Sequence, residues 1–263
     1  MNKNELKQAV EKEIKEAEAK VSFMVENLDT NEILLSFDSD NSVVSASVIK
    51  VAIMLTALEL VKEGKFTIDT LIIMPENTIL SDSEVFEYGA GSYTLNELLV
   101  WMIINSDNSA TNCLIDFLTM DRINEYCRSL FLKSTKVERR MLDFKALKTG
   151  HNNYTSAMDM KVIYKALYDK TILTPELCDY SISILKRQRH KELSMRYICD
   201  EVVVAHKTGG LHFLNHDAGI FYLENANYYF GAFVTEAPSN EYAMRLIGRI
   251  SKLIYEYYKE SNL

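Results

Sequence analysis

The chain has 263 residues, of which 48% are hydrophobic and 25% are charged, with only three prolines. This composition is typical of a globular protein with a packed core and excludes a disordered or fibrous chain. The formal net charge of −8 excludes a general binder of the nucleic-acid backbone, because that role needs a basic surface. We therefore expect no nucleic-acid partner, and the length allows one large domain or two interleaved ones.

The first twenty residues alternate positive and negative charge and contain no long apolar run. They lack the apolar centre of a secretory signal and the length of a membrane span. As written, the sequence predicts a cytoplasmic protein without a membrane span, or a secreted one if a leader has been removed. Cys113, Cys127, Cys178 and Cys199 form no CxxC pair and have no His at metal-ligand spacing. We therefore expect buried free thiols, and no metal or other cofactor.

The first predicted element is an amphipathic helix, because apolar residues recur at helical spacing among Glu and Lys: Leu6, Val10, Ile14 and Ala17. A β-hairpin follows, with apolar residues alternating over 21–25 and 33–37 around the turn Asp29-Thr30-Asn31. Residues 48–60 are apolar nearly all round and stop at Gly64, which predicts a buried helix with a glycine cap.

Capping signals mark three further helix starts, at Thr94 with Glu97, at Ser156 with Asp159, and at Thr174-Pro175-Glu176. Three strands are predicted over residues 202–206, 218–223 and 228–234. A last helix follows, with Leu246, Ile247, Ile250, Leu253 and Ile254 directed inward.

No linker, repeat or low-complexity run divides these elements, so we expect a single domain over 1–263. The two ends, 1–46 and 200–263, supply the predicted strands and are expected to share one sheet in an α/β lobe. Residues 47–199 are expected to form an all-α lobe. An active site between the two lobes follows naturally from this arrangement.

Three short motifs carry candidate chemistry, and each pattern occurs twice in the chain. The first set is Ser47-Val48-Ile49-Lys50, Ser106-Asp107-Asn108 and Lys207-Thr208-Gly209. The second set is Ser183-Ile184-Leu185-Lys186, Ser39-Asp40-Asn41 and Lys148-Thr149-Gly150. Each pattern alone is therefore weak, and the element predicted around each match decides between the two sets.

The serine and lysine of the first motif lie where the hairpin ends and an apolar helix begins. Because Ser47 and Lys50 are three residues apart, they fall on the same face at the helix N-terminus. Backbone N–H groups there can stabilise an oxyanion, and a desolvated amine can accept the proton of the hydroxyl. Ser183 and Lys186 instead lie within a helix before the polar KRQRHK run, which favours a solvated face.

For the other two motifs, too, the predicted element around each match decides which match is the functional candidate. Residues 106–108 interrupt two apolar stretches, as a short connection between helices does, whereas residues 39–41 follow a strand and are ordinary turn formers. Lys207-Thr208-Gly209 follows the β-branched run VVVAH, and Gly209 with Gly210 allows a ligand to approach the strand closely. Residues 148–150 have no strand before them and indicate a helix end with a glycine cap.

With three motifs in this order and in suitable elements, the chain resembles the class A β-lactamase family. The flanking segments SASVIK, MIINSDNSATNCL, VVVAHKTGGL and NHDAGIFYL resemble the family as well. The resemblance runs from Val21 to the last helix. It implies a β-lactamase/transpeptidase-like α/β (α+β) fold, with an antiparallel sheet flanked by the N- and C-terminal helices, plus an all-α lobe.

The resemblance also implies catalytic roles for three residues. Ser47 would attack the carbonyl of a β-lactam or an acyl-D-amino acid, and Lys50 would accept its proton. Ser106 would relay a proton to the leaving nitrogen.

The same resemblance implies a substrate-binding set. Asn108 would hold the amide side chain of the substrate, and Lys207 and Thr208 would contact its carboxylate. Gly209 and Gly210 belong to the same strand, and the N–H groups of Ser47 and Gly210 would form the oxyanion hole.

One departure from the family lies in the segment KVERRMLDFKALKTG, where class A enzymes carry E-x-x-L-N. Met141 replaces the glutamate, which is the accepted base for deacylation, and Lys145 replaces the asparagine. We therefore expect impaired deacylation. Glu138 or Asp143 either acts as a relocated base or merely solvates the loop. Ala218 also replaces an arginine common on the return strand, which predicts looser carboxylate recognition.

The expected function is a serine hydrolase that opens β-lactam amide bonds through a Ser47 acyl-enzyme. The alternatives are a penicillin-binding peptidase or esterase, a covalent penicillin-binding sensor without turnover, and a serine-dependent glutaminase. We expect a monomer that acts on a small-molecule β-lactam or acyl-D-amino-acid substrate.

Overall fold

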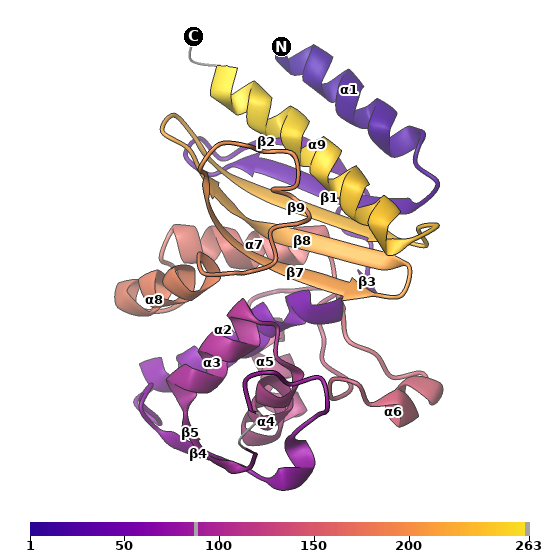
Figure 1. Ribbon diagram of the computed structural model, residues 1–263. Helices are drawn as coiled ribbons and strands as arrows, with labels where there is room; N and C mark the ends of the chain where they lie inside the picture. The colour runs from indigo at the N-terminus through magenta and orange to yellow at the C-terminus, as the bar shows by residue number, and fades with distance from the viewer. Residues whose placement is uncertain (87–88, 261–263) are drawn as a thin grey trace.

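The computed structural model describes residues 1–86 and 89–260. Its centre is a five-stranded antiparallel sheet with strand order β2-β1-β9-β8-β7 (Figure 1). The strands are β1 (Lys20–Asn27), β2 (Glu32–Phe37), β7 (Val203–Leu211), β8 (Leu214–Tyr222) and β9 (Asn227–Thr235). Strands from the two ends of the chain therefore share one sheet.

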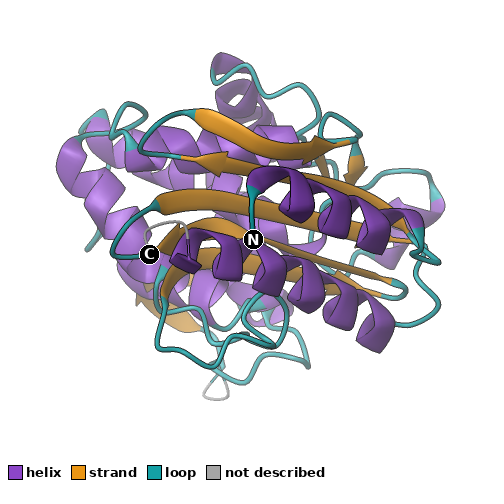
Figure 2. Ribbon diagram, turned by 90° about the horizontal axis from the view of Figure 1, so that it is seen from above, coloured by secondary structure: helices purple, strands orange, loops and turns teal. Residues whose placement is uncertain are grey.

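The two terminal helices, α1 (Lys3–Lys15) and α9 (Asn240–Glu260), lie side by side over one face of this sheet (Figures 1 and 2). The predicted apolar stripe of α1 is buried at Leu6, Val10 and Ile14, whereas Ala17 lies beyond the end of the helix. Helices also cover the opposite face, so the inner residues of β1 are buried on both sides rather than alternately.

The helices of the middle segment pack below the sheet (Figure 1). They are α2 (Lys50–Lys62), α3 (Leu95–Ile104), α4 (Asn108–Leu118), α5 (Met120–Ser129), α6 (Phe144–Lys148), α7 (Ala157–Tyr168) and α8 (Pro175–Leu185). Helix α2 is buried over nearly its whole circumference, which confirms the prediction from its apolar sequence. It therefore forms the centre of the core of this lobe and fixes the position of its own N-terminus.

The predicted helix boundaries are confirmed where a cap defines them. Thr94 and Glu97 form a capping box at the start of α3. Ser156 caps α7 and Thr174 caps α8, each through a side-chain oxygen that accepts a backbone N–H. Beyond the end of α2, Gly64 has φ of +73°, a left-handed conformation that glycine adopts without strain.

The middle segment contains short strands and 3₁₀ turns that the sequence did not predict. Strand β3 (Val43–Val44) pairs with β6 (Tyr154–Thr155), and β4 (Leu71–Met74) pairs with β5 (Gly91–Thr94). Short 3₁₀ helices form η1 (Ala46–Ile49) and η2 (Glu76–Thr78). Pairs of only two to four residues carry too little periodicity to be predicted from sequence.

Cys113, Cys127 and Cys178 are buried free thiols, but Cys199 is exposed, so the expectation of buried thiols is wrong for this residue. It lies in the irregular segment between α8 and β7, outside the packed helices and strands.

Within residues 1–86 and 89–260, no helix is both long and apolar enough to span a bilayer.

Candidate active site

The three motifs chosen in the sequence meet around the side chain of Ser106. Lys50, the first residue of α2, donates from Nζ to the Ser106 carbonyl at 2.6 Å and contacts Ser106 Oγ at 3.1 Å. Lys207 on β7 reaches the same hydroxyl, with Nζ 3.1 Å from Ser106 Oγ. Residues separated by more than fifty positions in the chain are therefore joined through one hydroxyl group between two amines.

The nucleophile candidate lies on a strained turn held against β7. Ser47 is half-buried in η1, and the preceding Ala46 has φ of +45°, which is uncommon for a residue with a Cβ atom. A Cβ atom on Gly209 would lie 2.9 Å from the Ser47 nitrogen and 3.2 Å from the Ser45 carbonyl oxygen. Glycine at this position therefore lets β7 contact the backbone of the Ser47 turn, whereas the sequence analysis expected it to admit a ligand.

The second motif forms the tight link between α3 and α4. Ser106 has φ of +57°, and Asp107 caps α4 by accepting the Ala110 N–H at 2.7 Å. The other oxygen of Asp107 accepts the Ser83 hydroxyl at 2.6 Å. Asp107 therefore has a structural function here: it fixes the conformation that presents Ser106 to the two lysines.

The two lysines at Ser106 are fully buried, which determines their protonation. Burial lowers the pKa of Lys50 well below its ordinary value, and the positive charge of Lys207 lowers it further. Burial also lowers the pKa of Lys207 to about 7, an effect that the Asp217 carboxylate opposes. Two ammonium ions side by side without water are unfavourable, so when Lys207 is charged, Lys50 is disfavoured as a second cation.

The amide of Asn108 links the lysine to an outer carboxylate. Its Oδ1 accepts from Lys50 Nζ at 2.9 Å, and its Nδ2 donates to Asp82 Oδ2 at 2.7 Å. Within the described part of the chain, Lys50 Nζ makes no hydrogen bond with Ser47 Oγ. Lys50 is therefore directed toward Ser106 and Asn108 in this structure.

A cavity of about 330 Å³ opens above these groups. Six of the predicted site residues line it: Ser47, Ser106, Asn108, Thr208, Gly209 and Gly210. Lys50 and Lys207 lie buried beneath it. The structure thus brings all eight predicted residues to one place, although they come from η1, α2, the α3–α4 link, the start of α4 and β7.

Comparison with known proteins identifies the family. The model of the beta-lactamase enzyme family matches residues 5–258, nearly the whole chain. The chain belongs to this family. A beta-lactamase of Bacteroides uniformis is 25% identical over 230 residues, covering 80% of this chain and 77% of that protein. The D-alanyl-D-alanine carboxypeptidase DacF of Bacillus subtilis strain 168 is 26% identical over 157 residues, covering 57% of this chain and 39% of that protein.

Solved structures have the same fold. A beta-lactamase from Chitinophaga pinensis superposes with a TM-score of 0.90 at 21% identity, covering 96% of this chain and 99% of that one. The structure of PBP-A superposes with a TM-score of 0.89 at 24% identity, covering 97% and 96%. The family match makes the protein a β-lactamase-like hydrolase, and the superpositions show the β-lactamase/transpeptidase-like fold that the resemblance implied.

The second match of each motif occupies an ordinary structural position. Ser183 is exposed on α8 and donates to the Tyr180 carbonyl within the same helix. Residues 39–41 lie at the turn after β2, and residues 148–150 end α6, with Gly150 at φ of +88°. Their elements agree with the sequence interpretation in each case.

The segment that departs from class A is held by its own structural contacts. Met141 is buried, and its backbone N–H and C=O both bond the side chain of Asn112. Glu138 pairs with Lys136 at 2.8 Å, and Asp143 caps α6. Neither carboxylate lines the Ser47 cavity. Both residues thus have partners outside the candidate site.

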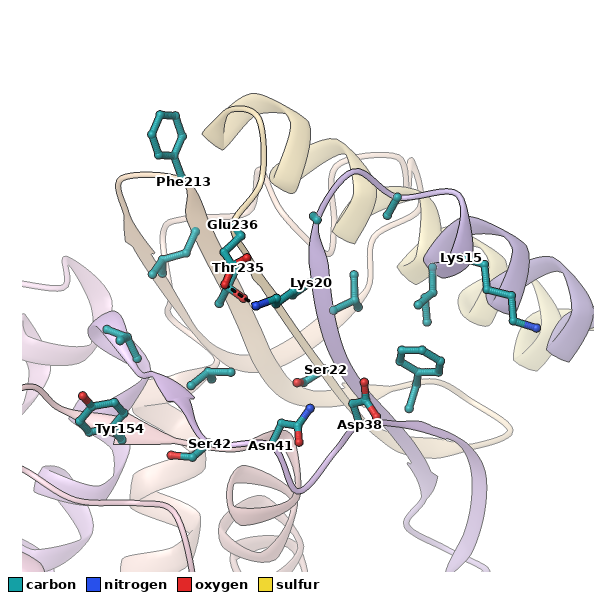
Figure 3. A pocket seen from close by; sticks show the side chains of 18 of the residues that line it. Lys15, Lys20, Ser22, Asp38, Asn41, Ser42, Tyr154, Phe213, Thr235 and Glu236 are labelled. Carbon is teal, nitrogen blue, oxygen red and sulfur yellow. Dashed lines mark hydrogen bonds and ion pairs between the residues drawn. The ribbon is translucent and has the colours of Figure 1, made fainter.

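A larger cavity of about 900 Å³ lies elsewhere, at the end of the sheet beside β1 and the β7–β8 turn (Figure 3). Its lysine Lys20 is exposed and pairs with Glu236 at 2.7 Å. No buried lysine lies beside a serine among the described residues that line this cavity. This larger cavity is therefore not lined by any residue of the three chosen motifs.

The cavity around Ser47 also contains residues that the sequence analysis did not select. These are His190, Glu192, Leu193 and Asn215. The polar run that includes His190 was interpreted as a solvated face, because a charge run without periodicity usually is one. In the sequence, His190 and Glu192 are marked only by their spacing of two residues, a pattern too common to indicate a site.

Proposed function

We propose that the protein opens β-lactam amide bonds through an acyl-enzyme on Ser47, and that it acts as a monomer on this small-molecule substrate. The observation that carries the proposal is the pair of buried lysines on either side of Ser106 Oγ. The cavity takes its lining from both predicted lobes, residues 47–199 and 200–263, which supports a cleft between them within one domain.

Acylation begins with the Ser47 hydroxyl attacking the lactam carbonyl while Lys50 accepts its proton. The lowered pKa of Lys50 supports this role, because a neutral amine has the lone pair that the transfer needs. Lys50 has to exchange a bond to Ser106 or Asn108 for one to Ser47 when substrate enters, as catalytic contacts often tighten on binding. The proton then passes through Ser106 Oγ, 3.1 Å from Lys50 Nζ, to the lactam nitrogen as its bond to carbon breaks.

The remaining predicted residues bind the substrate. Protonated Lys207 and the Thr208 hydroxyl attract its carboxylate, and the Asn108 amide meets its acyl side chain. The N–H groups of Ser47 and Gly210 stabilise the oxyanion, a task favoured by the close packing of β7 on the Ser47 turn.

Deacylation is the step that this chain performs less well than acylation. A water that hydrolyses the ester must be activated by a base, and Met141 has no basic atom.

The missing base also supports a second candidate function, namely a penicillin-binding peptidase acting on acyl-D-amino-acid peptides. The 26% identity to a D-alanyl-D-alanine carboxypeptidase supports it as well.

Parallel assays with nitrocefin and with an acyl-D-alanyl-D-alanine peptide distinguish the two. Hydrolysis of nitrocefin that is lost in Ser47→Ala supports the first function. Release of D-alanine with only stoichiometric reaction of nitrocefin supports the second. Reaction of neither substrate would reject both.

A further inference from the structure

The segment from Gln188 to Ser194, between α8 and β7, is irregular but fastened at both ends by buried polar side chains. At its start, Gln188 Nε2 donates to the Ile103 carbonyl at 2.8 Å, and Gln188 Oε1 accepts the N–H groups of Arg189 and His190 at 2.9 and 3.1 Å. Gln188 is only 2% exposed. The position of the His190 backbone is thus set by a buried amide anchored on the end of α3.

The other end is held by the carboxylate of Asp217 on β8. Asp217 Oδ2 accepts the Ser194 hydroxyl at 2.6 Å and the Ser194 N–H at 3.1 Å, and Oδ1 lies 2.8 Å from His206 Nδ1. Asp217, Ser194 and His206 are all 1% exposed. A buried, hydrogen-bonded carboxylate is costly to leave without partners, so these bonds tie this end of the segment to β8.

Between these anchors the segment presents a histidine and a carboxylate to the Ser47 cavity. His190 Nδ1 lies 3.3 Å from Glu192 Oε1, and both residues line the cavity that Ser47 lines. The other described residues that line it offer hydroxyl, amide, glycine backbone or leucine groups. Among the described residues that line this cavity, His190 therefore supplies the imidazole and Glu192 the carboxylate.

We propose that His190, oriented by Glu192, is the general base that hydrolyses the Ser47 acyl-enzyme in place of the loop glutamate that Met141 replaces. This inference rests on the proposed function, since it needs an acyl-enzyme at Ser47. The cavity volume of about 330 Å³ holds several waters, at roughly 30 Å³ each. A water between His190 and the ester carbonyl therefore fits the space.

The water oxygen bonds to the ester carbonyl carbon while His190 Nε2 takes one water proton, and Nδ1–H donates to the Glu192 carboxylate, which stabilises the imidazolium. The tetrahedral intermediate collapses, the bond from carbon to Ser47 Oγ breaks, and the imidazolium returns the proton to that oxygen. The products are the carboxylic acid and free Ser47.

His190 lies between two cavities that share residues of the candidate site. It also borders a second cavity, of about 250 Å³, whose charged lining is Asp82, Glu84, Asp107 and Arg189. With Glu192 added, four carboxylates and one guanidinium line the two cavities that His190 borders.

The test separates acylation from deacylation in the full-length protein. The acyl-enzyme is formed with benzylpenicillin, excess drug is removed, and the decay of the adduct is followed by intact mass spectrometry. The variants are His190→Gln, Glu192→Gln and, as a matched control, Lys191→Ala, which lies between them but lines neither cavity. We expect deacylation about 10²-fold slower in His190→Gln and about 10-fold slower in Glu192→Gln, with acylation changed less than about threefold.

Rescue distinguishes a base from a merely structural residue. Added imidazole should restore deacylation of His190→Ala and leave Lys191→Ala unaffected. Equal deacylation in His190→Gln and the unsubstituted protein overturns the inference, as does an unsubstituted acyl-enzyme that does not hydrolyse at all. Failure of Ser47 to become acylated instead rejects the proposed function, and the inference with it.

Discussion

Replacing the buried Lys207 by methionine is expected to stabilise the protein at low pH while it weakens binding of anionic substrates. Lys207 is fully buried, and burial lowers its pKa from 10.5 to about 7. The unfolded chain therefore binds one proton more than the folded chain between these two pH values. Stability that depends on Lys207 rises with pH over this window and is lowest below about pH 7.

The size of the effect follows from the same pKa. The fall from 10.5 to about 7 corresponds to about 5 kcal/mol of penalty for the folded state at low pH. Methionine removes this penalty but also the bonds to Ser106 Oγ and the Thr208 carbonyl, which are worth about 1 kcal/mol each. We expect Lys207→Met to be about 3 kcal/mol more stable below pH 7. Lys50 loses a repelling neighbour in the variant, which acts in the same direction.

Urea unfolding of both proteins between about pH 6 and pH 9 checks this prediction. The advantage of the variant should shrink by about 1.4 kcal/mol per pH unit above pH 7. Lys148→Met, at an exposed lysine in the second K-T-G match, should show no such dependence. A difference that is constant over this range, or a variant less stable than the original at the acidic end, would refute the reasoning.

Three further outcomes are expected. Lys50→Ala should slow acylation by about 10²-fold or more in stopped-flow experiments with nitrocefin, and an unchanged rate would exclude Lys50 as the base. Gly209→Ala places a Cβ atom 2.9 Å from the Ser47 nitrogen, so the strand must move and acylation should fall by about 10-fold or more; full activity would show that the turn adapts. Because Met141 cannot activate water, nitrocefin should give a burst followed by a slow steady state, and a fast linear course would contradict this.

The features that the sequence predicted well are those determined by local rules. The capping box of Thr94 and Glu97, the Gly64 conformation and the buried circumference of α2 each depend on a few neighbouring residues. The motif matches were separated by their elements, and Ser183 on the exposed face of α8 shows why that criterion works.

The features that it missed depend on contacts between distant segments. Nothing in the sequence indicates that Asp82 meets Asn108, or that Asp217 holds Ser194, because each pair is brought together by packing. The turn at Ser47 was also missed: it is 3₁₀ rather than the first turn of an α-helix, and β7, distant in sequence, packs against it at Gly209.

The central claim is that Ser47 forms the covalent bond with substrate. Incubation with a fluorescent penicillin, digestion and peptide mapping by mass spectrometry test it most directly. The account predicts one adduct, on the peptide that contains Ser47, which is absent in Ser47→Ala and intact in Ser183→Ala. An adduct on another residue, or one that survives Ser47→Ala, would contradict it.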